Sequence, residues 1–411
     1  MAYPAEVVPF LEELAQFRLR PEGGQVETRP YGDDESAFLV PTYFNEFWTA
    51  QQRQAAAIHE IPYRACFKPQ LPRFFIDRLS SPGDLIYDPF MGRGTTVIEA
   101  ALLGRRVAGC DLNLLSRCFT EPRLNPPTVE AVQERLDSLD LEKRTTVRND
   151  LRAFYHPATL REITHLRRYL HERGKEADAV DNWLRLVALT RLTGHSSGFL
   201  SVYTLPPNQA VSIAAQRRIN ERRDQTPPRR ELRPILVKKT QALLRGMQPE
   251  ALDALRQAGR DALIMTQDAR HTVQVPDNSV QLTVTSPPFL DVVDYQGDNW
   301  LRLWFAGVPG KLQGLITPRT PQAWATAMAQ VFAETLRITR PGGYLVCEVG
   351  EVRHGQVQLE QYLIPAVAKV GWQPVAVLQH QQEFTKTAHC WGVSNNSGGT
   401  NSHRIAVFRK G

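Results

Sequence analysis

The sequence shows no closely paired cysteines, no pattern typical of a leader and no long apolar run. Its five cysteines are odd in number and form no CxxC pair, which argues against a disulfide framework or a zinc knuckle and suits a reducing compartment. The first residues, MAYPAEVVPFLEELAQF, contain no basic stretch followed by an apolar core, so no secretory signal is predicted. No stretch approaches the roughly 18 apolar residues of a membrane span. We therefore expect a soluble, cytoplasmic protein.

A metal site is not expected either. His389, Cys390 and His403 are the residues that could suggest one, but their spacing matches no common site. Two nucleotide fingerprints are also incomplete: the third glycine of the dinucleotide motif and the GK[ST] of a P-loop are both missing.

The chain is long enough for two or three domains, and its 42% of hydrophobic residues supports a large core. Its positive charge is concentrated in one segment. Between Ala214 and Gly246 ten Lys or Arg residues face three acids, so this segment carries +7, against +6 for the whole chain. Such a patch is typical of a protein that binds a polyanion. The alternative is a solvated helix face.

Two parts of the chain, about 70–115 and 262–411, alternate between strand and helix patterns. Strands are expected at 84–88, 106–111, 262–266, 281–285, 344–349, 374–380 and 404–409, helices at 71–79, 95–103 and 322–338, and a turn at 340–343. The residues between these parts show helical periods, for example 160–170 and 183–192. The pattern predicts a doubly wound α/β sheet interrupted by one insertion. The expected domains are an N-terminal lead-in at 1–50, a catalytic domain at 51–120 and 262–411, and a helical, basic insert at 121–261.

A glycine-rich turn follows the first expected strand. Residues 88–96 read DPFMGRGTT, so a strand ends in an acid, a Gly-x-Gly turn follows, and a helix begins. Glycines allow the backbone to approach a ligand, and ligands of open α/β sheets lie beyond the carboxyl ends of the strands. Asp111 ends the next strand, where an acid can accept hydrogen bonds from ribose hydroxyls. Together they favour an adenosine-containing cofactor.

A second motif, TSPPF at 285–289, follows a later strand. Its two prolines stiffen the backbone and remove two amide donors, which leaves carbonyl oxygens to accept from an amino group. Ser286 adds a hydroxyl and Phe289 a ring that can stack on a planar base. Such a site suits a base taken out of the helical stack. The alternative is a rigid turn without a chemical role.

These two motifs resemble those of a known family, the amino-group DNA methyltransferases. DPFMGRGTT is similar to their cofactor motif and TSPPF to their catalytic motif, while YRACFKPQ at 63–70 resembles the segment that closes over the methionine end of the cofactor. The resemblance spans roughly 40–115 and 262–411, in the order cofactor motif, insertion, catalytic motif. It implies a Rossmann-like, seven-stranded methyltransferase sheet with an inserted helical target-recognition domain.

The resemblance also implies a cofactor, S-adenosylmethionine, and residues that hold it. Asp268 takes the place of the acid that contacts the adenine ring, with Asp150 as the alternative. The implied cofactor-binding residues are Phe67, Asp88, Phe90, Gly92, Gly94, Thr95, Thr96, Asp111 and Asp268. The implied catalytic residues are Ser286, Pro287, Pro288 and Phe289.

In the implied mechanism the Ser286 hydroxyl and the Pro287 carbonyl hold the amino group, and Phe289 stacks on the extruded base. Asp291, Asp294 and Tyr295 either line the pocket or, for the two acids, begin a helix. The insert is the expected DNA reader, because arginines clamp phosphates and read guanine edges. Its candidate DNA-binding residues are Arg217, Arg218, Arg222, Arg223, Arg229, Arg230, Lys238 and Lys239.

Serine at position 286 resembles the cytosine-N4 enzymes, since the adenine-N6 enzymes usually carry an acid or Asn there. The predicted function is therefore methylation of the N4 amino group of cytosine in double-stranded DNA, within a restriction-modification or self-marking system. The alternatives are an adenine-N6 DNA or RNA amino methyltransferase and a catalytically silent DNA-binding module. The expected partner is double-stranded DNA, in the cytoplasm at the nucleoid, with no membrane. A cognate restriction endonuclease and a monomeric or homodimeric state are left open.

Overall fold

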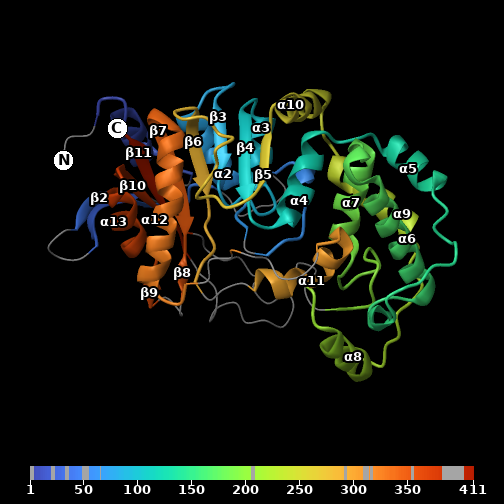
Figure 1. Ribbon diagram of the computed structural model, residues 1–411. Coiled ribbons are helices and arrows are strands. Elements are labelled where there is room, and N and C mark those ends of the chain that lie inside the picture. Colours follow the sequence, from blue (N-terminus) through green and yellow to red (C-terminus); the bar gives the residue numbers. More distant parts are fainter. Residues whose placement is uncertain are drawn as a thin grey trace.

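The computed structural model describes residues 4–19, 24–32, 37–48, 55–64, 66–204, 209–290, 294–308, 314, 318–352, 356–381 and 402–411. A mixed sheet with helices on both faces stands beside a lobe of helices (Figure 1). Among the described residues, no helix is both long and apolar enough to cross a membrane.

All seven expected strands are present and lie next to one another in one sheet. In sheet order they are β5 (Leu263–Thr266), β4 (Arg106–Asp111), β3 (Leu85–Asp88), β6 (Val280–Thr285), β7 (Thr339–Val349), β11 (Ser402–Lys410) and β10 (Trp372–Gln381). The pairs from β5 to β7 are parallel, and β11 runs antiparallel to both of its neighbours. This order confirms the predicted Rossmann-like, doubly wound α/β class.

The sheet has nine described strands instead of the predicted seven. Residues expected to form an N-terminal lead-in contain a short helix, α1 (Val8–Gln16), and the hairpin of β1 (Gln25–Tyr31) and β2 (Phe38–Asn45). β2 pairs in parallel with β10 and so extends the sheet. Two prolines in these strands, Pro30 and Pro41, weaken the strand pattern in the sequence. The pairing with β10 is a long-range contact that local periodicity does not reveal.

The turn expected at 340–343 lies inside β7. The pairing of β7 with β6 jumps from Val280 opposite Thr339 to Leu282 opposite Tyr344, and Gly342 has φ of +79°. The Pro-Gly-Gly sequence therefore forms an irregularity within the strand. A separate two-stranded ribbon follows, made of β8 (Glu351–Val352) and β9 (Val357–Gln358).

Each face of the sheet is covered by its own helices. α2 (Gln70–Leu79) and α3 (Thr95–Leu102) pack Phe75 and Ile98 against Val284 and Val346 on one face. On the other face, α12 (Pro321–Ile338) and α13 (Glu360–Lys369) bury Phe332 and other apolar side chains against β7 and β11. The expected helices at 71–79, 95–103 and 322–338 correspond to α2, α3 and α12.

The helical lobe has a core of its own. It contains α5 (Val129–Ser138), α6 (Pro157–Arg173), α7 (Ala179–Arg191), α8 (Ile213–Arg222) and α9 (Leu232–Leu244), with short 3-10 turns at Asn149–Ala153 and Gly174–Glu176. Two helices that extend beyond the expected insert share this core: α4 (Leu114–Leu124), which begins before it, and α11 (Tyr295–Ala306), which follows it. Conversely α10 (Pro249–Arg260), which lies within the expected insert, places Leu255 in the core beside α3. Helical periods were expected between the two α/β parts, but the sequence predicted neither the full α11 nor the core in which each helix is buried.

Candidate active site at the carboxyl edge of the sheet

The chemistry-bearing residues predicted from the sequence follow four adjacent parallel strands. β3 ends at Asp88, β4 at Asp111, β5 precedes Asp268, and β6 precedes Ser286. Because these strands are parallel and adjacent, their carboxyl ends lie on one edge of the sheet. The alternative acid, Asp150, lies in the helical lobe and pairs with Arg148.

The glycine-rich turn takes a backbone shape that requires glycine. Gly92 has φ of +50°, and Gly94 has φ of +75° at the N-cap of α3. A Cβ on Gly94 would lie 2.2 Å from Thr120 Oγ1, so α4 packs directly against this turn. Thr95 and Thr96 begin α3 and are buried, and Thr96 Oγ1 donates to the carbonyl of Val284 across 3.0 Å. The turn is thereby fixed against β6.

Asp88 connects this turn with the SPPF segment. Its side chain is 1% exposed, and its Oδ1 accepts from Thr285 Oγ1 at 2.7 Å and from the Phe90 amide at 3.0 Å. Burial raises the pKa of Asp88 to about 7, although both hydrogen bonds oppose that rise. Thr285 directly precedes Ser286, so one hydrogen bond joins the two motifs.

Asp111 is held by backbone donors. Its Oδ2 accepts from the Gly92 amide at 2.9 Å and its Oδ1 from the Asn113 amide at 2.8 Å. Burial raises the pKa of Asp111, and these bonds limit the rise. Asn113 in turn caps α4 and donates from Nδ2 to Tyr63 OH at 3.3 Å. The acid is therefore fixed beside the glycine turn, where each carboxylate oxygen keeps a second lone pair for a ligand.

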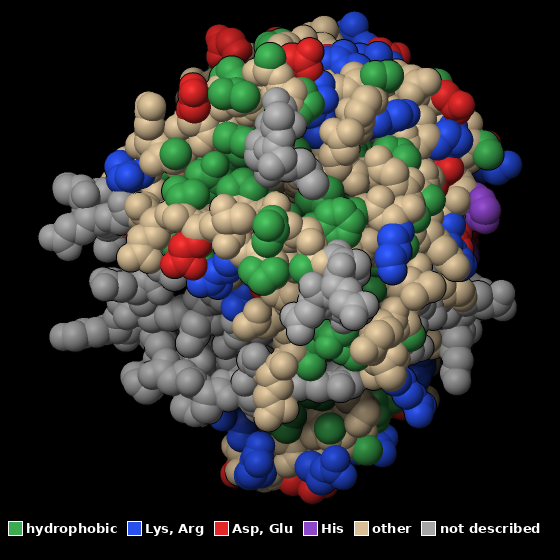
Figure 2. Space-filling model, turned by 90° about the vertical axis from the view of Figure 1, so that its left-hand side faces the viewer, with side chains coloured by type: hydrophobic (Ala, Val, Ile, Leu, Met, Phe, Trp, Pro, Cys, Tyr) green, Lys and Arg blue, Asp and Glu red, His purple; other side chains and the backbone are tan. Residues whose placement is uncertain are grey.

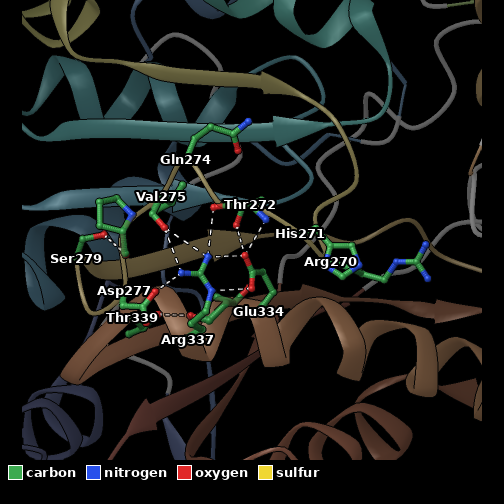
Figure 3. Close-up of polar contacts among 12 residues, drawn as sticks. Arg270, His271, Thr272, Gln274, Val275, Asp277, Ser279, Glu334, Arg337 and Thr339 are labelled. Atoms are coloured by element: carbon green, nitrogen blue, oxygen red, sulfur yellow. Dashed lines mark hydrogen bonds and ion pairs between the residues drawn. The ribbon is translucent and has the colours of Figure 1, made fainter.

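Asp268 is already engaged in an ion pair. Arg270 Nη2 lies 2.6 Å from its Oδ2, and this pairing lowers the pKa of the Asp268 carboxyl. Arg270 also donates to Gln330 on α12 at 3.2 Å. The adjoining residues are tied to the same helix (Figure 3): Glu334 accepts from the Thr272 amide at 2.7 Å and pairs with Arg337 at 2.6 Å. The segment after β5 is thus fastened to α12.

Arg93 braces the segment that resembles the cofactor-closing one. Its Nη1 donates to the carbonyl of Ile61 at 3.0 Å and its Nη2 to that of Phe67 at 3.1 Å. Phe67 is 9% exposed and belongs to the core on the α2 face. Motif reasoning assigned no role to Arg93, although its place between Gly92 and Gly94 was a usable signal.

The SPPF segment is anchored from α12. Trp324 Nε1 donates to the carbonyl of Pro288 across 2.8 Å, so this carbonyl is occupied, contrary to the expectation that the proline carbonyls are free. Ser286 is half-buried and Pro287 is buried. Phe289 is partly buried against the core under α12, beside Leu290. Trp324 was missed in the sequence, where a single Trp in an alanine-rich helix was its only signal.

Of the residues just after the motif, Asp294 begins α11, as one reading of the sequence expected. Its side chain accepts from the Gly297 amide at 2.8 Å. Asp291 and the side chain of Tyr295 lie outside the described residues, as do His389 and Cys390. His403 pairs with Glu348, and no group of three possible metal ligands occurs in the described ranges.

Most of the candidate DNA-binding residues are exposed, and some of them already contact other residues of the protein. Cations are exposed on α8 and after it, and Figure 2 shows Lys and Arg side chains at the foot of the molecule, at the height of α8 in Figure 1. Among them Arg223 stacks over Tyr203 at 3.9 Å, and Arg229 pairs with Glu162. Lys239 is only 7% exposed and donates to the Glu60 carbonyl at 2.8 Å. The exposed members are Arg217, Arg218, Arg222, Arg223, Arg229 and Lys238, whereas Arg230 is half-buried.

Part of the chain matches known proteins in sequence. Residues 33–115 match the family described as DNA methylase. Type II methyltransferase M.MjaII of Methanocaldococcus jannaschii is 31% identical over 97 residues, which is 23% of this chain and 18% of that protein. Type II methyltransferase M1.MboII of Moraxella bovis is 52% identical over 46 residues, or 10% and 18% of the two chains.

A third relative is named as an enzyme that methylates RNA. The tRNA (guanine(10)-N2)-dimethyltransferase of Methanocaldococcus jannaschii is 28% identical over 115 residues, or 24% of this chain and 32% of that one. The matched stretches therefore span less than a third of the length of these relatives. Among solved structures, a DNA modification methylase of Thermus thermophilus complexed with S-adenosyl-L-methionine is 23% identical, with coverage of 35% of this chain and 53% of that one and a TM-score of 0.21. Residues 33–115, which contain the glycine turn and Asp111, thus match the DNA methylase family, and the predicted resemblance to the amino-group methyltransferases, N6 or N4, is confirmed.

Proposed function

We propose that this protein transfers a methyl group from S-adenosylmethionine to the exocyclic N4 amino group of cytosine in double-stranded DNA. The observation that carries the proposal is the hydrogen bond between Thr285 and Asp88, which joins the glycine turn to the SPPF segment. This bond brings a cofactor-type turn and an amino-binding motif to the same edge of one sheet. The named DNA methyltransferase relatives support a DNA substrate.

The residues present fit the cofactor. Gly92 and Gly94 give the turn two positive φ angles without a side chain at either position, and Asp111 offers lone pairs to the ribose hydroxyls. The remaining members of the proposed cofactor set are Phe67, Asp88, Phe90, Thr95, Thr96 and Asp268. Asp268 would contact the adenine ring of the cofactor if Arg270 shared or released its carboxylate. When bound, the cofactor supplies an electrophilic methyl group.

The SPPF segment positions the acceptor. Ser286 Oγ and the Pro287 carbonyl accept hydrogen bonds from the amino group and aim the nitrogen lone pair at the methyl carbon. The transfer would exchange the carbon–sulfur bond of the cofactor for a carbon–nitrogen bond, and the proton lost by the amino nitrogen would pass to solvent. Orientation provides most of the rate in such a direct transfer. Pro288, held by Trp324, keeps this backbone in place, and Phe289 contacts the extruded base.

Serine at position 286 is the reason for choosing cytosine. A hydroxyl replaces the acid or Asn that the adenine-N6 enzymes usually carry. To test the choice, the protein is incubated with methyl-labelled cofactor and DNA, and the labelled nucleoside is identified. N4-methyl-2′-deoxycytidine is the expected product. N6-methyl-2′-deoxyadenosine as the sole product overturns the cytosine assignment.

Two variants separate catalysis from binding. Ser286→Ala is expected to lower turnover while sparing DNA affinity. Ser279→Ala is the matched control, because Ser279 lies at the opposite end of β6 and its hydroxyl donates to the Pro276 carbonyl, away from the candidate site. A wild-type protein that binds DNA but has no affinity for the cofactor favours the alternative of a silent DNA-binding module.

An RNA amino methyltransferase is the second candidate, because one relative is named as a tRNA enzyme. Parallel assays with duplex DNA and transfer RNA distinguish the two. For the DNA enzyme, the helical insert is the target-recognition part, and the exposed α8 arginines contact phosphates. Its role in the cell is restriction-modification or self-marking, tested by methylation-sensitive sequencing of DNA from cells that express the protein.

A further inference from the structure

A basic cavity lies between the catalytic part and the helical lobe. It has a volume of about 900 Å³ and is bounded by residues 55–63 and 68–70 on one side and by residues 197–199 and α9 on the other. Among its described lining residues, Glu60 is the single carboxylate. The cations that line it are Lys68, Arg93, Arg191, Lys238 and Lys239. Neither Ser286 nor any of the acids at the sheet edge lines the cavity, but Tyr63, Lys68 and Arg93 do, so the cavity adjoins the candidate cofactor site from behind its glycine turn.

Two of these cations are held in the wall, and no described carboxylate forms an ion pair with either. Lys239 Nζ donates to the Glu60 backbone carbonyl, and the guanidinium of Arg191 lies 4.2 Å above the Phe199 ring. Arg191 Nε donates to the Thr190 carbonyl, and its Nη atoms have no hydrogen-bond partner within the described part of the chain. Burial lowers the pKa of Lys239 to about 8 and that of Arg191 to about 10, and neighbouring positive charge adds to both effects. Keeping such charges in the wall costs stability, which an anionic ligand offsets.

His59 adds an independent sign of a ligand. It is 4% exposed, and its Nε2 lies 2.8 Å from Glu99 Oε2. Its Nδ1 is buried without a hydrogen-bond partner among the described residues, and His59 lines the same cavity. A water molecule that bridges Nδ1 and a bound anion would satisfy this atom.

We propose that this cavity binds backbone phosphates of the DNA, an inference that rests on the proposed DNA substrate. Phosphate oxygens match the paired guanidinium and ammonium donors of Arg191 and Lys239. Lys68 and Arg93 belong to the catalytic part, whereas Arg191, Lys238 and Lys239 belong to the lobe. A phosphate in the cavity therefore links the two parts and fixes the DNA relative to both.

The test measures duplex binding at several salt concentrations, with S-adenosylhomocysteine saturating the cofactor site. Arg191→Gln and Lys239→Met are each expected to reduce the slope of log affinity against log salt by about 1, and the affinity at about 0.1 M salt by about five- to tenfold. Lys175→Met is the control, because Lys175 is an exposed lysine of the lobe outside the cavity. Slopes equal to that of the wild type in both variants overturn the proposal.

Proton linkage gives a second readout. Lys239 faces Arg191, Arg123 and Arg245, which lower its pKa, and Glu60, which raises it. Because the phosphate prefers the protonated amine, wild-type affinity is expected to fall as pH rises through about 8. Lys239→Met should lack this part of the decrease. An identical pH dependence in the two proteins contradicts a role for Lys239.

Two further measurements separate DNA binding from an effect on folding and from the binding of small anions. If Lys239 only supported the fold, Lys239→Met would lower the unfolding midpoint and leave the salt slope unchanged, which overturns the proposal. Inorganic pyrophosphate is titrated in parallel. Tight pyrophosphate binding that Lys239→Met abolishes, together with unchanged duplex slopes, would identify a small-anion site instead. Altered slopes in a protein that methylates nothing would refute only the proposed function, whereas methylation with unaltered slopes would refute only the cavity.

Discussion

Thr285 Oγ1 donates a hydrogen bond to Asp88 Oδ1 across 2.7 Å, from the end of one central strand to the end of the next. Both side chains are buried, at 0% and 1% exposure. The carboxyl of Asp88 therefore holds the residue that precedes Ser286 in position through this hydrogen bond. Its pKa of about 7, raised by burial, means that it changes charge near neutral pH.

Asp88→Asn should increase stability and decrease activity. A folded-state pKa above the unfolded value means that the contribution of Asp88 to stability is complete below about pH 4 and is lost as pH rises through 7. The variant should therefore unfold less readily at about pH 8, by at most about 4 kcal/mol, and should lose this pH dependence. Denaturant titrations at about pH 5 and about pH 8 measure the effect, and calorimetry measures the expected loss of cofactor affinity. Equal pH dependence in variant and wild type would contradict the raised pKa.

Gly94→Ala should weaken both folding and cofactor binding. The added Cβ would lie 2.2 Å from Thr120 Oγ1, at a φ of +75°. Gly104→Ala is a matched control, because Gly104 has the same φ but its nearest neighbour would be 3.9 Å away. Thermal unfolding should show a cost of about 1–3 kcal/mol beyond that of Gly104→Ala. Similar costs for the two variants would mean that backbone conformation, and not the contact with α4, sets the requirement for glycine.

Trp324→Phe should lower kcat more than it raises the KM for the cofactor. The variant loses the hydrogen bond to the Pro288 carbonyl, so the SPPF backbone is held less firmly. Trp372→Phe is the control, since Trp372 is also buried and donates to a backbone carbonyl, that of Phe332 at 2.9 Å, away from the SPPF segment. Each variant should lose about 1–2 kcal/mol of stability. If activity falls equally in both, the anchoring role of Trp324 is refuted.

Glu334→Gln should destabilise the protein at neutral pH but not near pH 2. The hydrogen bond from Arg337 lowers the pKa of Glu334 to about 2, below its unfolded value of 4.5. Its contribution to stability is thus present above about pH 4.5 and is lost as pH falls through 2. Unfolding monitored from about pH 2 to about pH 7 tests this sign. A constant difference across the range would show that the carboxylate charge is not what stabilises the contacts in Figure 3.

The sequence predicted the strands of the central sheet better than the packing around it. Alternation and turn residues marked all seven core strands, because buried strands need short apolar runs with breakers between them. The β1–β2 hairpin was not predicted, since Pro30 and Pro41 interrupt its pattern and its partner β10 is more than three hundred residues away. The helical period of α10 was visible, but the core that Leu255 joins depends on the tertiary fold.

In the candidate site too, the sequence predicted residues that local geometry requires but not those that act through tertiary contacts. Acids at strand ends and glycines in turns are visible because local geometry demands them, as at Asp88, Asp111 and Gly94. Trp324 and Arg93 act through contacts with residues that are distant in sequence, which a motif does not encode. The burial of Lys239 was also invisible, because a lysine in a basic run usually faces solvent.

The β1–β2 hairpin covers the edge of β10, and we expect this cover to hinder association between copies of the protein. Without the hairpin, β10 would be the outermost strand of the sheet. Its backbone at Val377 and Leu378, both fully buried, would then be open to pairing with strands of other molecules. β1 is a poorer template, because it carries Glu27, Arg29 and a proline without an amide donor. A chain shortened to begin after residue 45 would keep every proposed catalytic residue and is nonetheless expected to aggregate.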